Sequence, residues 1–203
     1  MNMTKVLCLI LALSFGMNVL AKEHKSDTIK SETIYFYKTA ILYQAYGPVK
    51  RIKLKSKDPL KSVNCEKFDR TGMFKDAVGL QYDSLGYLRS FDIGWKIGKM
   101  EMREEGSVEY DTGCLPVSIH VKTNVFQRFD ADFTYTYTDG VLTGKVVNYL
   151  MGKERGRLEY VYSDYECDEW GSWVKRKVKM MDFGEDQKKE ELEFVETRAI
   201  EYY

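Results

Sequence analysis

The chain is poor in the residues that most often carry chemistry or interrupt sheets. Its 203 residues include two histidines, three prolines and four cysteines, and 31 basic side chains balance 31 acidic ones. Without net charge, nucleic acid and anionic membrane surfaces are not expected as general partners. The sequence contains no G-x-S-x-G motif, glycine-rich phosphate loop or His/Cys metal pair, and it therefore predicts no catalytic residue, no cofactor and no metal site.

Long apolar runs are also scarce, and the longest lies at the beginning of the chain. Lys5 precedes an apolar stretch over residues 6–19, and Val19-Leu20-Ala21 is followed by charged residues. About fourteen residues are too few for a spanning helix, which needs roughly twenty. The pattern predicts a secretory signal helix at residues 1–21, cleaved after Ala21. We expect a periplasmic or extracellular protein with no transmembrane segment in the mature chain.

The remaining 182 residues are enough for one domain with a core. We expect a flexible segment at 22–33 and a single domain at 34–203. Cys65, Cys114 and Cys167 remain after cleavage, and their spacing fits no zinc motif. An odd number permits at most one internal disulfide. We predict no essential disulfide, with Cys167 buried and Cys114 the most reactive thiol.

What the chain has in abundance is aromatic residues in alternating patterns. It contains 15 tyrosines and 10 phenylalanines, and stretches such as "FTYTYTDG" and "LEYVYSD" place an apolar side chain at every second position. Side chains on successive residues of a strand point to opposite faces of the sheet, so this period predicts strands. In "LEFVETRAIEYY", Glu196 and Arg198 interrupt the apolar face. The sequence predicts an all-β fold.

A recurring short motif separates the predicted strands. "YDSLGYL" is echoed by "FDRTGMF", "YDTGCL", "YTDGVL" and "CDEWGSW". The aspartate can accept backbone N–H groups two residues on, and the glycine permits the positive φ that closes a hairpin. The versions at 110–113 and 137–140 are one residue shorter, and Asp139-Gly140 suits a two-residue type I′ loop. The predicted turn residues are Asp69, Gly72, Asp83, Gly86, Asp111, Gly113, Asp139, Gly140, Asp168 and Gly171.

These motifs resemble the YD repeats of RHS-type proteins. "AYGPVKRIKLKS", "CDEWGSWVKRKV" and "ETRAIEYY" are similar to segments of small exported YD-repeat-like proteins of Bacteroidales bacteria. The resemblance covers most of residues 46–203. It implies an antiparallel meander of degenerate hairpin repeats that forms one long twisted sheet, and it carries no catalytic residues over to this chain.

Tryptophan provides the one positive indication of function. Trp170 lies inside a predicted turn, where a core role is hard to arrange, and Trp95 stands in "FDIGWKIG". An exposed tryptophan at a hairpin end can stack on a sugar or enter a partner's pocket. Trp170 and Trp95 are therefore the candidate ligand-binding aromatics, whereas Trp173 is expected in the core. His120, on an alternating strand, is expected to be a partly exposed strand residue.

Three hypotheses for function follow. The first is an exported, non-catalytic binding or structural module of the cell envelope, whose partner is an unknown glycan or protein. The alternative is a hydrolase of envelope or host glycans that uses two carboxylates roughly 5 to 9.5 Å apart. The third, an RHS-type toxin shell, conflicts with the small number of hairpins, which cannot enclose a cargo.

Overall fold

The computed structural model describes residues 43–56, 65–68, 79–97, 100–124, 128–183 and 189–203. The expected signal helix, the segment at 22–33 and the turn at Asp69 and Gly72 lie outside these ranges. The described residues confirm the all-β prediction, because they form a single antiparallel sheet of 11 strands. Within these ranges, no helix is long and apolar enough to cross a membrane.

The strands range in length from three residues in β2 and β3 to 14 in β9 and β11. Their bounds are β1 Val49–Lys55, β2 Cys65–Lys67, β3 Leu80–Tyr82, β4 Leu88–Ile97, β5 Met100–Tyr110, β6 Pro116–Thr123, β7 Phe129–Thr138, β8 Val141–Met151, β9 Glu154–Cys167, β10 Trp173–Phe183 and β11 Lys189–Tyr202.

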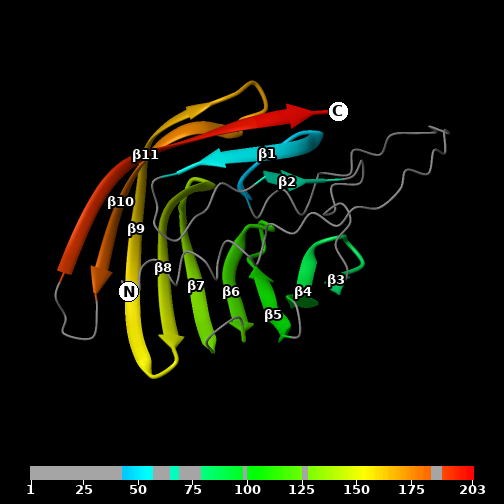
Figure 1. The fold of residues 1–203 in the computed structure, drawn as a ribbon. Helices are drawn as coiled ribbons and strands as arrows, with labels where there is room; N and C mark the ends of the chain where they lie inside the picture. Colours follow the sequence, from blue (N-terminus) through cyan, green and yellow to red (C-terminus); the bar gives the residue numbers. More distant parts are fainter. Residues whose placement is uncertain (1–42, 57–64, 69–78, 98–99, 125–127, 184–188) are drawn as a thin grey trace.

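The strand order is a meander with one exception. From β3 to β11 each strand pairs with the next in the chain, as the hairpin motif predicts. The exception is at the far margin, where β1 pairs with β11 and β2 pairs with β1. The first described strand therefore lies beside the last one, and Figure 1 shows them running together across the upper ends of β5–β8.

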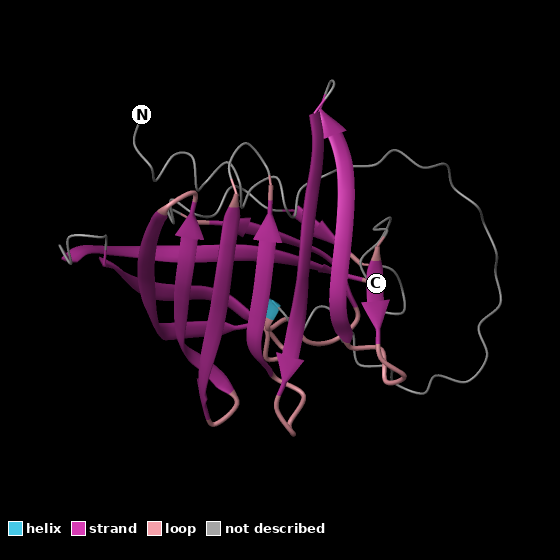
Figure 2. Ribbon diagram, turned by 90° about the horizontal axis from the view of Figure 1, so that it is seen from below, coloured by secondary structure: helices cyan, strands magenta, loops and turns pink. Residues whose placement is uncertain are grey.

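The sheet has an inner and an outer face. Figure 2, seen from below, shows that the sheet coils, so that some strands cross behind others at a steep angle. Alternate residues face inward, and in β9 the side chains of Leu158, Tyr160 and Tyr162 are buried as the "LEYVYSD" pattern predicts. Leu158 and Tyr160 join Phe129, Val147 and other side chains of β7–β11 in the largest apolar cluster.

Two smaller apolar clusters cover the remainder of the inner face. Leu88, Phe91, Val108 and Val121 pack together on β4–β6. Ala45, Val49, Ile52 and Phe68 pack together where β1 and β2 join the sheet. At about 25 cal/mol per Å² of apolar surface removed from water, such burial is the main stabilising contribution to a sheet of this kind.

Candidate functional site

The hairpin turns with aspartate share a definite geometry. Oδ1 of Asp83 accepts hydrogen bonds from the main-chain N–H groups of Leu85 and Tyr87, both at 2.9 Å. The N–H of Gly86 donates to the carbonyl of Asp83, and Gly86 has a φ of 84°. The carboxylate thus satisfies the donors of the turn, while glycine supplies the left-handed conformation.

The turn at Asp111 corrects the sequence-based prediction. Asp111 makes two of the contacts that Asp83 makes, because its Oδ1 accepts from the N–H of Leu115 at 2.8 Å and its carbonyl accepts from the N–H of Cys114. Cys114, with a φ of 65°, occupies the position that Gly86 holds in the other turn. The turn is therefore not one residue shorter, and Gly113 is not its left-handed residue. Asp139 and Gly140 do form a two-residue connection, with φ values of 51° and 77°.

The fourth of these turns carries Trp170. Oδ1 of Asp168 accepts from the N–H groups of Trp170 at 3.0 Å and Ser172 at 2.9 Å, and Gly171 has a φ of 78°. Trp170 occupies the same turn position as Leu85 in the turn at Asp83. Both side chains are exposed, at 47% for Trp170 and 61% for Leu85. The turn therefore fixes the backbone of an aromatic residue that the core does not enclose.

Two neighbours hold the indole ring in place. A Cβ atom at Gly47 would lie 2.6 Å from Cδ2 of Trp170, so the absence of a side chain at Gly47 allows the ring to lie against the backbone. The ring of Tyr202 is 5.8 Å away, centroid to centroid, and tilted by 34°. We call Gly47, Asp168, Trp170, Ser172 and Tyr202 the Trp170 platform. It brings together the beginning of β1, the end of β11 and the turn between β9 and β10.

Hydrogen bonds below the ring connect these three segments. The hydroxyl of Tyr202 donates to Oδ2 of Asp168 and contacts Oγ of Ser172 at 3.2 Å. The N–H of Tyr46 donates to the same Oγ at 2.7 Å. Burial raises the pKa of Tyr202 to about 12, and the bond to Asp168 acts in the same direction. The phenol therefore remains a neutral hydrogen-bond donor at physiological pH.

A buried arginine anchors the same region from the inner face. The guanidinium of Arg198 donates to the main-chain carbonyls of Trp173, Tyr43 and Gln44, the last at 2.6 Å. It also lies 4.0 Å from the ring centroid of Trp173, which is buried as expected. Burial, together with the charge of Arg176, lowers the pKa of Arg198 to about 9. Arg198 thereby ties residues 43 and 44 to the sheet.

A buried ion pair lies next to it. The guanidinium of Arg176 contacts the carboxylate of Glu196 at 2.7 Å, and both side chains are almost completely buried. Oε1 of Glu196 accepts from the hydroxyl of Ser56 at 2.9 Å. The Arg176 guanidinium also stacks on the ring of Tyr162, 3.9 Å from its centroid. We call Arg176, Glu196 and Arg198, with the segment 43–56 that they hold, the seam.

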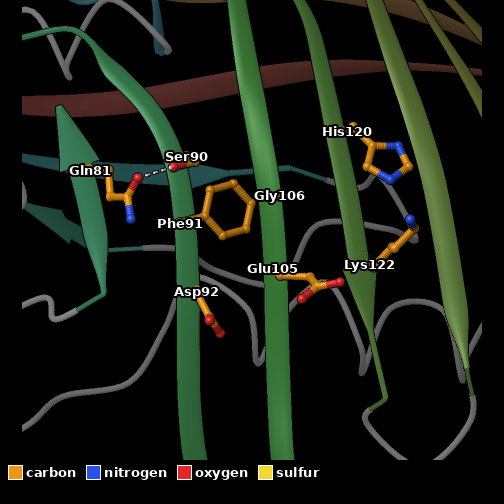
Figure 3. Close-up of a pocket in the computed structure, with 8 residues that line it drawn as sticks. All are labelled: Gln81, Ser90, Phe91, Asp92, Glu105, Gly106, His120 and Lys122. Carbon is orange, nitrogen blue, oxygen red and sulfur yellow. Dashed lines mark hydrogen bonds between the residues drawn. The ribbon is translucent and has the colours of Figure 1, made fainter. Parts of the chain in front are cut away.

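The outer face contains a separate, shallow pocket of about 320 Å³. Figure 3 shows its lining on β3–β6: Gln81, Ser90, Phe91, Asp92, Glu105, Gly106, His120 and Lys122. Asp92 lies directly opposite Glu105, outside any turn. However, Arg103 binds Asp92 through two hydrogen bonds, of 2.6 and 2.7 Å, and lowers its pKa. A carboxylate held in its ionised form is poorly suited to donate a proton.

His120 lies at the margin of this pocket. Its side chain is 33% exposed, in keeping with a strand residue on the outer face. Nδ1 is 2.6 Å from Oδ1 of Asp132 and Nε2 is 3.5 Å from Oδ1 of Asp130, both on β7. The two carboxylates fix the ring across the β6–β7 pair. Among the described residues, no group of three His, Cys, Asp or Glu side chains is arranged to hold a metal ion.

The other candidate residues are Trp95, Cys114 and Cys167. Trp95 belongs to β4, pairs with Met102 and is not part of the Trp170 platform; its side chain lies outside the described part of the structure. Cys114 is half-buried, but Cys167 is exposed, which is the opposite of the prediction. Burial of Cys167 was expected because it fills the pre-aspartate position that Tyr82 and Phe68 fill in other repeats, but two register shifts between β9 and β10 and a left-handed Asp164 make the end of β9 differ from those repeats.

Sequence reasoning missed the seam. Glu196 and Arg198 were recognised only as interruptions of an apolar face, although this position was itself the signal. Charged residues that alternate in phase with Phe194 and Ile200 must be buried wherever those residues are buried. Nothing in the local pattern could identify Tyr43 and Gln44 as the acceptors for Arg198, because they lie about 150 residues away.

Comparison with protein-family models, with curated proteins and with solved structures finds no match to the chain. The assignment of function therefore depends on the side chains themselves.

Proposed function

We propose that the protein is an exported, non-catalytic β-repeat module that binds a glycan or protein component of the cell envelope. We further propose that it belongs with the small exported YD-repeat-like proteins. The repeated turns at Asp83, Asp111 and Asp168, with their common hydrogen-bond pattern, support this relationship. The sequence pattern that predicts a signal peptide at residues 1–21 supports export.

The single observation that carries the binding role is the Trp170 platform. Tryptophan is the largest apolar side chain, and nearly half of this one is exposed although neighbouring residues hold it in place. Immobilising a side chain on binding costs about 0.5–1.5 kcal/mol, and a ring that is already fixed avoids most of that cost. An aromatic face of this kind stacks on sugar rings or fills a partner's pocket.

The hydrolase alternative gains little from the outer-face pocket. It requires one carboxylic acid that donates a proton and a second that stays ionised. Arg103 lowers the pKa of Asp92, so Asp92 does not meet the first requirement. The pocket is also formed by open strands, without a described segment that closes over it.

The test is a binding screen of the mature protein against immobilised glycans and envelope proteins. For a ligand found in this way, Trp170→Ala is expected to weaken binding at least about tenfold, equivalent to 1.4 kcal/mol. Leu85→Ala is the matched control, because Leu85 has the equivalent position in another turn, and it is expected to leave binding unchanged. Equal effects of the two substitutions would remove Trp170 from the binding site. Turnover of a peptide, glycan or ester that is abolished by changing one carboxylate would overturn the non-catalytic function.

A further inference from the structure

The Trp170 platform covers one face of the indole ring and leaves the other free. A Cβ atom at Gly47 would lie 2.6 Å from Cδ2, 2.7 Å from Cε3 and 2.9 Å from Cγ of Trp170, so it would approach three ring atoms almost equally. Gly47 therefore lies over a face of the ring and not beside its edge. Because the side chain is still 47% exposed, the opposite face and the ring edges provide the exposed surface.

A ring that is covered on one face is suited to stacking and not to insertion. An aromatic hot spot of a protein interface is enclosed by a pocket of the partner, which Gly47 prevents on its side of the ring. The ring of Tyr202 is tilted by 34°, so the two rings form no parallel slot for a flat group. A sugar ring needs only one aromatic face, whose negative charge density attracts the C–H groups on one side of the sugar.

The other residues of this turn do not extend the apolar surface. Besides Trp170 it contains Asp168, Glu169, Gly171 and Ser172, and Glu169 is exposed. A protein interface of standard size buries about 800 Å² on each partner around an apolar centre, for which the turn provides a single apolar side chain. One aromatic plane beside a few polar groups is instead the combination that fixes a small polar ligand such as a sugar.

The charges near the platform favour a sugar without an acidic group. Lys50 and Lys175, the lysines that follow Gly47 and Ser172 in the chain, are in ion pairs with glutamates. The buried guanidinium of Arg198 already donates to three main-chain carbonyls. An anionic sugar on Trp170 would therefore lie beside the acidic residues of the turn without a cation to balance its charge. An uncharged sugar avoids this repulsion.

We propose that the Trp170 platform binds an uncharged pyranose unit of a polysaccharide, which stacks on the free face of the indole ring. This inference rests on the binding role proposed above and narrows its ligand to one chemical class. The fixed ring provides the apolar contact, and the exposed carboxylate of Glu169 is available to accept hydrogen bonds from sugar hydroxyl groups.

The probes are immobilised uncharged polysaccharides, namely dextran, laminarin, mannan, chitin and cellulose, each compared with its own carboxymethylated form. The two members of a pair have the same sugar backbone and differ in charge. The mature protein is expected to bind at least one of the uncharged polymers. It is expected to bind the carboxymethylated form of that polymer at least about tenfold more weakly, equivalent to 1.4 kcal/mol.

Two substitutions of Trp170 separate stacking from general apolar contact. Trp170→Phe keeps a flat ring, whereas Trp170→Leu keeps apolar volume without a plane. Trp170→Leu is expected to weaken binding of the polysaccharide at least about tenfold, and Trp170→Phe only about threefold. The side chain lies in an exposed turn, so urea unfolding should show that both variants remain folded. Equal losses of binding in the two variants would overturn stacking as the mode of contact.

The outcomes also separate this inference from the proposed function. If none of the uncharged polysaccharides binds, the sugar ligand is refuted, and the binding role survives only if an envelope protein binds in a manner that requires Trp170. Equal binding of each polymer and its carboxymethylated form would refute the selection of an uncharged sugar. Binding that Trp170→Ala leaves unchanged for every ligand would refute both the inference and the role of the platform.

Discussion

The β4–β6 part of the sheet and the seam are held together by different means. On β4–β6, strands from consecutive hairpins bury the apolar side chains of Leu88, Phe91, Val108 and Val121. At the seam, Arg176, Glu196 and Arg198 join segments more than 130 residues apart through buried charges and hydrogen bonds. Apolar packing is non-directional, whereas ion pairs and hydrogen bonds depend on the orientation of the groups that form them.

This difference follows from how each pair of strands is connected. A hairpin fixes the register of its strands through the turn, so apolar packing only has to stabilise a pairing that is already determined. β1 and β11 have no turn between them. We infer that the buried ion pair and the carbonyl contacts of Arg198 select the register there. Buried charges stabilise less than apolar residues of the same size, but they are costly to misalign.

The largest effect should come from breaking the seam. Glu196→Ala leaves the guanidinium of Arg176 buried without its carboxylate, and is expected to lower the free energy of unfolding by about 3–5 kcal/mol. Urea unfolding at pH 7 measures this. Glu201→Ala is the control on the same strand, because the Lys50–Glu201 pair is exposed to solvent and its removal should change stability far less.

A double replacement sharpens the comparison. Combining Arg176→Met with Glu196→Leu removes both charges and keeps the volume, so stability should return to near the parent value. If register selection is the role of the pair, the double variant should lose protection of the β1 amides while the rest of the sheet keeps its own. A loss of less than about 1 kcal/mol in Glu196→Ala would contradict the role given to the seam.

Alkaline pH should weaken both regions. Burial raises the pKa of Tyr87 and of Tyr202 to about 12, and it also raises the pKa values of Tyr110, Tyr135 and Tyr137. A folded-state pKa above the unfolded value of about 10 contributes stability that is complete below pH 10 and is lost as pH rises toward 12. Denaturant unfolding at pH 9, 10 and 11 should show a progressive decline.

Arg198 acts in the opposite direction within the seam. Its pKa of about 9 lies below the ordinary value, so the unfolded state binds more protons above pH 9 and this residue makes stability rise with pH there. The tyrosines outnumber it, and the net result should be a decline. Arg198→Met should steepen that decline, and Tyr202→Phe should make it shallower. A flat profile between pH 9 and 11 would show that the phenols are not held neutral.

The turns allow a smaller test within the hairpin region. Gly86→Ala places a side chain at a φ of 84° and should cost about 1–2 kcal/mol. Cys114→Gly, at the equivalent position of the next aspartate turn, should stabilise the protein by about 1 kcal/mol. Thermal unfolding of the two variants provides the measurement. Effects of the same sign would mean that the two turns are not equivalent.

The smallest effect concerns the thiols. Cys167 is exposed and Cys114 is half-buried, so a thiol reagent should label Cys167 first in the native protein. Cys167→Ser should change stability by less than about 0.5 kcal/mol. Faster labelling of Cys114 would indicate that the register shifts between β9 and β10 do not expose Cys167.

The sequence predicted the strands and turns, which depend on residues that are close together in the chain. Alternating aromatics indicated the strands, and the Asp and Gly residues at 83, 86, 168 and 171 lie in turns with the expected hydrogen bonds. The prediction was wrong at Cys114 because a non-glycine residue in the left-handed conformation leaves no compositional signal. It was wrong at Cys167 because the position before the aspartate is not equivalent in every repeat when the strand before the turn is irregular, as β9 is.

The sequence could not predict contacts between distant segments. That β1 lies beside β11 depends on the coiling of the whole sheet, which no window of residues contains. The Trp170 platform shows the same limit. Trp170 was identified as an exposed candidate, but Gly47 and Tyr202, which hold its ring, come from the two ends of the described chain.

The pairing of β1 with β11 also sets the order of events when the chain is made. Ile52 pairs with Ile200, so β1 is synthesised well before the strand that it pairs with. The hairpins from β3 to β10 can form locally in the meantime, whereas closure over so long a separation is slow. Residues 198–202 include Arg198 and most of the partners of β1. The formation of β11 therefore decides when β1 becomes folded.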